Sequence, residues 1–286
     1  MKKLSKIILM GLAILALTGC FKRDVYENIK IYTTVYPVEY ITSTLYGDHS
    51  KVSSIYPSGI DINTYVITNK KMNDYSKGDL FIYNGLSSEK DIAASLLNKN
   101  KKMDIIDVSQ GLEVKNDVTE LWLSPANFLM MTSNIKNGLK NYITHKTLLD
   151  GIDKNYEDIK LKISEIDAEL KLIAENTSNK KLIVANNAFK FLEKYGFEVI
   201  SIAADDENSN TNVSQAQKIF SNKSNSYLFM LAGTEETDVI KDLVSKGATK
   251  VEISNMITLT EEERKNECDY FILINEFIEA IKAEVY

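Results

Sequence analysis

The loop at residues 57–65, PSGIDINTY, contains the first side chains in the chain that could bind a ligand. Pro, Gly, Asp and Asn at short intervals indicate a loop, and loops often present side chains to ligands. The loop contains no His and no Cys, and its candidate groups are the Asp61 carboxylate and the Asn63 amide. Such groups suit a hard cation or a hydrogen-bonding solute better than they suit zinc.

Other reactive side chains in the chain are few and scattered. The two histidines, His49 and His145, lie far apart and form no pair at metal-ligand spacing, so an ordinary zinc-type cluster is excluded. Cys268 is either a reactive thiol or an idle one near a helix start. The nearest candidate acid, Glu120, has no obvious partner carboxylate, and no Gly-x-Ser-x-Gly elbow or Gly-rich phosphate loop is present. We therefore predict that the protein is not an enzyme.

The first twenty residues have the layout of a secretory signal. Three lysines precede an apolar run over 7–17, which is shorter than the ~20 residues of a spanning helix, and the segment ends in Leu-Thr-Gly-Cys at Cys20. A small residue before Cys20 indicates a lipoprotein cleavage site, although a signal peptidase I site with an incidental Cys is the alternative. More than one acyl chain on Cys20 gives stable anchoring. We predict a signal peptide over 1–19, a tether over 20–28, and an extracytoplasmic protein lipid-anchored to a bacterial membrane.

Composition limits the partners and the architecture of the mature chain. The net charge is −6, and basic residues alternate with acidic ones, which argues against a nucleic-acid partner. An acylated Cys20 cannot pair with Cys268, so no disulfide framework is expected. The mature part, about 265 residues, is long enough for two modest domains with sizeable cores.

Short β-rich runs and helical patterns alternate in both halves of the chain. This alternation predicts parallel sheets covered by helices on both faces. The expected strands are 29–35, 51–56, 79–84, 104–108, 181–185, 198–203, 226–231 and 250–253, and the expected helices are 38–45, 89–98, 188–195, 213–220, 235–246 and 269–284.

One segment between the halves predicts a single long amphipathic helix. Isoleucine and leucine recur at steps of three and four over 155–174, which places them on one face. We expect this helix to begin near Gly151 and to end near Asn176. The prediction is an α/β fold with lobes at 29–150 and 177–286, each with a mostly parallel sheet, joined by a rigid helix over 151–176. Ligands of such folds bind where the carboxyl ends of the strands face each other.

Seven motifs in order resemble one family, the metal-binding proteins of bacterial ABC importers for zinc and manganese (cluster A-I, or cluster 9), some of which were first described as adhesins. The motifs are TTVYPVEYI, PSGIDINTY, GDLFIYNGLSSE, DIIDVSQGL, LWLSPANFLMMTSNI, KNYEDIKLKISEIDAEL and ANNAFKFLEKYGF. The resemblance covers nearly all of the mature chain. It implies a solute-binding role, with an ABC permease and an ATPase as partners and a small ligand or a metal ion in the cleft between the lobes.

The resemblance also implies four ligand positions, and this chain differs at each. The family binds one metal ion, usually through three His and one Asp, with Glu replacing the third His in manganese-type members. Carried over residue by residue, the positions are Asn63, Glu120, Asn186 and Ser254. Imidazole suits zinc and carboxylates suit manganese. Zinc sites worth ~10 kcal/mol or more rest on thiolate and imidazole ligands. The family implies zinc or manganese, but this set is weak for either.

Three explanations remain open for the substituted pocket. The cleft could hold a different small polar solute through Asn63, Glu120 and Asn186. It could instead hold a hard cation with help from Asp61 or from the acidic residues 205–207. In the third explanation the cleft is vestigial, and the lipoprotein acts through its surface as an adhesin or an accessory subunit. We predict a solute-binding component of an importer with weak transition-metal affinity, and the surface role is the alternative.

Overall fold

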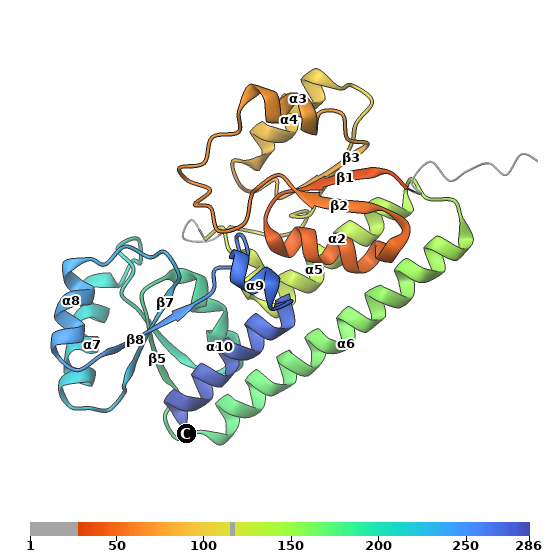
Figure 1. Cartoon of the computed structure of the whole chain (residues 1–286). Helices are drawn as coiled ribbons and strands as arrows, with labels where there is room; N and C mark the ends of the chain where they lie inside the picture. The colour runs from red at the N-terminus through yellow and green to blue at the C-terminus, as the bar shows by residue number, and fades with distance from the viewer. Residues whose placement is uncertain (1–27, 115–117) are drawn as a thin grey trace, which may run out of the picture.

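The computed structural model describes residues 28–114 and 118–286, and the chain folds there around two parallel four-stranded sheets (Figure 1). The predicted signal peptide, Cys20 and all but the last residue of the tether lie outside the described residues. The first sheet has the order β2-β1-β3-β4 and the second the order β6-β5-β7-β8, and every pair is parallel. The strands are β1 (Lys30–Thr33), β2 (Lys51–Ser54), β3 (Leu80–Tyr83), β4 (Asp104–Asp107), β5 (Lys181–Val184), β6 (Glu198–Ser201), β7 (Tyr227–Leu231) and β8 (Thr249–Ile253).

Helices cover both faces of each sheet, as the strand-helix alternation predicts (Figure 1). In the first lobe, α3 (Asn69–Tyr75) and α4 (Glu89–Lys99) lie on one face, and α2 (Tyr36–Tyr46) and α5 (Pro125–Lys140) lie on the other. In the second lobe, α7 (Ser209–Ser221) and α8 (Asp238–Ser245) cover the outer face. The opposite face packs on α10 (Tyr270–Val285) and on η3 (Asn187–Tyr195), which is a 3₁₀ helix. The predicted fold class is therefore confirmed.

The long helix α6 (Lys146–Asn176) runs along both lobes (Figure 1). The sequence prediction of its end near Asn176 is confirmed, but the prediction of its start near Gly151 is wrong. The buried side chains of Leu148 and Ile152 extend the apolar face beyond that glycine. A glycine inside a helix costs about 1 kcal/mol, which this burial outweighs. None of the described helices is long and apolar enough to cross a bilayer.

Residues 255–269, here called the return segment, lead from β8 back to the first lobe and include α9 (Glu261–Lys265). The amides of Tyr36 and Gly59 donate hydrogen bonds to carbonyls of this segment, each at 2.9 Å. Arg264 contacts the first lobe through Ser58 Oγ at 2.7 Å and Glu39 Oε2 at 2.9 Å. The second lobe is thereby attached to the first by more than the long helix.

The main hydrophobic core is continuous between the two lobes. At its centre the buried Tyr270 ring of α10 stacks on Phe128 of α5, with ring centroids 3.7 Å apart. The Tyr270 hydroxyl donates to the Trp122 carbonyl at 2.7 Å, and the Trp122 indole donates to the Asn255 carbonyl at 2.9 Å. A smaller core lies beneath α7 and α8. The shared core therefore fixes the positions of the loops at the strand ends of both lobes.

Candidate solute-binding cleft

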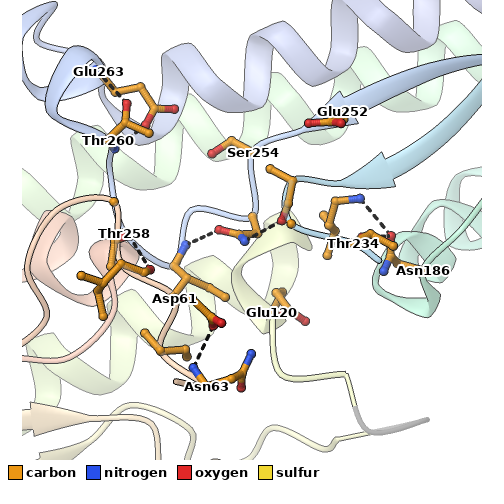
Figure 2. A pocket seen from close by; sticks show the side chains of 18 of the residues that line it. Asp61, Asn63, Glu120, Asn186, Thr234, Glu252, Ser254, Thr258, Thr260 and Glu263 are labelled. Atoms are coloured by element: carbon orange, nitrogen blue, oxygen red, sulfur yellow. Dashed lines mark hydrogen bonds between the residues drawn. The ribbon is translucent and has the colours of Figure 1, made fainter. Parts of the chain in front are cut away.

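A pocket of about 770 Å³ lies between the lobes, and all four predicted positions line it (Figure 2). Asn63 follows β2, Asn186 follows β5, Ser254 follows β8, and Glu120 directly precedes the short helix η2 (Leu121–Leu123). Three of the four thus lie beyond the carboxyl ends of parallel strands, where ligands of open α/β sheets bind. Figure 2 shows Asp61 and Asn63 on one side of the pocket and Asn186 on the other, with Glu120 between them.

The loop that carries Asn63 is fixed by its own aspartate. The Asp61 carboxylate accepts hydrogen bonds from the backbone N–H of Asn63 at 2.9 Å and from the Thr64 hydroxyl at 3.3 Å. This Asx-type turn is a usual role of Asp in loops. Gly59 has a φ of +68°, and its amide donates to Leu259 in the return segment. The arrangement leaves the Asn63 side chain exposed at the pocket wall.

Asn186 is held in a single orientation by two hydrogen bonds. Its Oδ1 atom accepts from the Leu231 amide at 2.9 Å and from the Thr234 hydroxyl at 3.1 Å (Figure 2). Because a backbone N–H can only donate, the oxygen end of the amide must face Leu231. The side-chain NH₂ is the group that remains for a ligand. Asn186 therefore offers a hydrogen-bond donor to the pocket.

Glu120, before η2, and Ser254, after β8, complete the set. The half-buried Glu120 side chain forms no hydrogen bond or ion pair with the described residues. Ser254 Oγ accepts from the Met256 amide at 3.3 Å. The adjacent Asn255, which the sequence analysis did not single out, bonds Ala232 and Ile257 through both ends of its amide and fixes the turn after β8. A lone Asn after a strand is too common to signal this role.

The pocket is lined by carboxylates from five separate segments. They are Asp61, Glu120, Glu252, Glu263 and Glu276, and none of the described residues that line it is basic. Clefts with one sign of charge concentrate ligands of the opposite sign. The sequence could not show this cluster, because its members come together only when the return segment and α10 pack beside the strand ends.

The donor set does not suit a transition-metal ion. Within 28–114 and 118–286, no three His, Cys, Asp or Glu side chains are close enough to hold one. The acidic residues 205–207 do not supply the missing ligands, because Asp206 is buried in an ion pair with Lys190 and none of the three lines this pocket. Asp205 lines a neighbouring pocket and Glu207 another. The hard-cation explanation thus loses the acidic residues 205–207, and Asp61 is the proposed helper that does line the pocket.

Two parallel α/β lobes, a long helix along both and a pocket between them form a two-lobed α/β fold with a cleft between the lobes. Residues 31–284 match the family described as zinc-uptake complex component A, periplasmic (ZnuA), and the chain belongs to this family. The family consists of metal-binding transport proteins and not of enzymes, which confirms the non-enzymatic prediction.

Individual relatives are similar at low identity. The high-affinity zinc uptake system protein ZnuA of Bacillus subtilis is 22% identical, with 90% of this chain and 87% of the relative aligned. The manganese ABC transporter substrate-binding lipoprotein PsaA of Streptococcus pneumoniae is 28% identical over 68% of this chain and 70% of its own length. Relatives of this chain thus include both zinc and manganese proteins.

Solved structures share the fold. The metal-dependent lipoprotein YcdH from Bacillus subtilis superposes with a TM-score of 0.75 at 20% identity, covering 90% of this chain and 99% of that one. The Zn(II)-bound ZnuA-like domain of Streptococcus pneumoniae AdcA gives 0.72 at 19% identity, with the same coverage. The laminin-binding protein Lbp of Streptococcus pyogenes gives 0.73 at 17%, covering 91% and 100%.

Proposed function

We propose that this chain is the solute-capturing component of an ABC importer, that acylation of Cys20 anchors it outside the cytoplasm, and that it binds zinc and manganese weakly. A permease and an ATPase would receive its solute. The family assignment supports the transport role, and the names of the zinc and manganese relatives supply the metals to be tested.

One observation carries the proposal. The four loops that bear the family's ligand positions converge on a single organised pocket, while their side chains are Asn, Glu, Asn and Ser. Convergence favours capture of a solute over the alternative of a surface adhesin with a vestigial cleft. The side chains argue against a transition metal, because the Asn186 oxygen is already engaged and Glu120 is the only carboxylate among the four.

Calorimetric titration of the mature protein with zinc and manganese, after chelator treatment, tests the metal part. We expect no binding tighter than millimolar. The matched control restores the family's ligands with Asn63→His, Glu120→His, Asn186→His and Ser254→Asp in one chain, and should gain zinc affinity of micromolar or better. Sub-micromolar one-to-one binding by the unaltered protein would contradict the proposal.

The anchor is tested separately. Cys20→Ser should release the full-length chain from the membrane fraction and abolish incorporation of labelled fatty acid, because the thiol carries the lipid. A Cys268→Ser variant serves as control and should remain in the membrane fraction. Membrane retention of Cys20→Ser would remove the lipid anchor from the proposal.

A further inference from the structure

A second pocket, of about 260 Å³, opens beside the cleft within the first lobe. It is here called the Glu89 pocket, and its lining includes Tyr56, Asn84, Glu89 and Trp122. Asn63, Ile62 and Ile257 line both spaces, so the Glu89 pocket adjoins the cleft. It is smaller than the ~300–1,000 Å³ typical of a whole small-ligand site, which suits one arm of a solute.

The pocket lies at the topological switch point of the first sheet. The strand order β2-β1-β3-β4 reverses direction between β1 and β3, and the residues that follow these two strands, Val35 and Asn84, line the pocket. Ligand crevices of open α/β sheets occur at such points. This architecture therefore leaves an opening at that point, and Glu89, the first residue of α4, is among the residues that line it.

Glu89 is a buried carboxylate without a cationic partner among the described residues. Its side chain lines the pocket although the residue is 3% exposed, and its Oε2 atom accepts a hydrogen bond from the Asn84 amide at 2.8 Å. Burial raises the pKa of Glu89 to about 7, the nearby Asp107 adds to the rise, and the Thr34 hydroxyl and the Asn84 amide oppose it. Burying an unpaired charge is costly, so such a group is a candidate for ligand binding.

The remaining lining favours an organic cation over a metal ion. The aromatic residues Tyr56 and Trp122 are buried and are among the residues that line the pocket. Aromatic rings beside a carboxylate are the chemistry that recognises ammonium groups. A divalent metal ion would require more oxygen ligands of full charge, and no described cluster supplies them. The cleft next to it is lined by five carboxylates, and none of its described lining residues is basic.

We propose that the cleft and the Glu89 pocket together bind one small organic cation, whose ammonium group pairs with Glu89. The rest of the solute lies in the cleft, where Glu120 faces further positive charge and the Asn186 NH₂ group donates to a hydroxyl or carbonyl oxygen. This inference rests on the proposed solute-capture function and names the chemical class of the solute.

Calorimetric titration of the mature protein with a matched series tests the inference. The probes are a four-carbon diamine, the amino alcohol of the same length and the neutral diol. We expect both amines to bind and the diol not to bind. Glu89→Gln keeps an oxygen for the Asn84 amide and removes the charge, so it should lose about 10- to 100-fold in affinity for the amines.

The control variant is Asp91→Asn, which removes an exposed carboxylate from the same helix and should bind the amines like the unaltered chain. Circular dichroism and melting temperature establish that Glu89→Gln is folded. Equal binding of diol and amines, unchanged amine binding by Glu89→Gln, or no amine binding at millimolar concentration would each overturn the inference.

A second measurement separates this inference from the function on which it rests. Native mass spectrometry of the protein after exposure to a culture filtrate would show whether a solute binds and what charge it carries. A bound organic cation, lost in Glu89→Gln, is the expected result. A bound neutral or anionic solute would overturn the cation inference and leave solute capture standing. The absence of any bound mass would contradict both.

Discussion

Asn186 shows why a ligand position can be recognised before its chemistry is known. The resemblance placed it in the pocket, and the structure brings it there together with Asn63, Glu120 and Ser254. The direction of its amide depends on the Leu231 and Thr234 donors, which lie 45 and 48 residues further along the chain. No local pattern contains that information. The same is true of the five carboxylates, because each is unremarkable in its own segment.

The buried Glu89 carboxyl group predicts how the stability of the protein depends on pH. Its folded pKa of about 7 exceeds the ordinary value of 4.5, so the folded state binds the proton more tightly than the unfolded state does. The resulting stability is fully present below pH 4.5 and is lost as the pH rises through 7, and the total is about 3 kcal/mol. The Glu89→Gln variant has no titrating proton at this position. Its stability relative to the unaltered chain should therefore increase as the pH rises.

Urea unfolding of both proteins at a series of pH values from 4 to 8 measures this difference. The titratable neighbours of Glu89, Asp107 and Tyr56, are present in both proteins, so their contributions cancel in the comparison. Two stability curves that run parallel across this range would show that Glu89 titrates normally. The Glu89 pocket would then have an ordinary carboxylate at its base.

Among the helices and strands, the sequence predicted every strand of the two sheets and the long helix, but it missed α3, α5 and α9. All eight strands occur within their predicted ranges or one residue from them, because buried parallel strands read as apolar runs. The helix α5 was not predicted from periodicity, although Phe128, Met131, Ile135 and Leu139 are spaced as one buried face. The short helices α3 and α9 bury no residue and begin at Thr68 and Thr260 caps, so they had no apolar pattern to find.

The contact between α10 and η2 gives a stability prediction. Tyr270→Phe removes the hydroxyl that donates to the buried Trp122 carbonyl and leaves that acceptor unpaired. We expect a loss of about 1–3 kcal/mol in the free energy of unfolding. Chemical denaturation measures the loss, and Tyr286→Phe, at a site 71% exposed, is the control that should change little. Equal stability of the two variants would mean that another donor satisfies the carbonyl.

Contacts at several places in the molecule hold the two lobes in a fixed position relative to each other. Asn155 of α6 donates to the carbonyls of Thr44 and Leu45 at the end of α2, while Asp167 of the same helix accepts from the Tyr195 hydroxyl in the second lobe at 2.7 Å. The return segment adds hydrogen bonds next to the pocket, and the hydrophobic core is shared. The sequence predicted the linking helix but could not reveal the return segment, whose partners lie in the first lobe.

This arrangement predicts that ligand binding changes the shape of the molecule little, in contrast to hinge closure. Small-angle X-ray scattering of the mature protein, with and without a saturating amine from the series above, should give radii of gyration that agree within error. A hinge-type binding protein measured in parallel provides the positive control. A clear decrease in the radius of gyration on binding would show that the lobes close and that the hydrogen bonds of the return segment do not prevent it.

The return segment also has a consequence for how the chain acquires its structure. Synthesis begins at the N-terminus, so the first lobe emerges well before residues 255–270. Yet Tyr36, Gly59 and Trp122 of that lobe find hydrogen-bond partners in this late stretch, and Phe128 finds its stacking partner in Tyr270. The first lobe therefore stays unfinished until the last part of the polypeptide arrives. The nascent chain would depend on chaperones to stay unfolded until then. The finished protein would unfold in one cooperative transition.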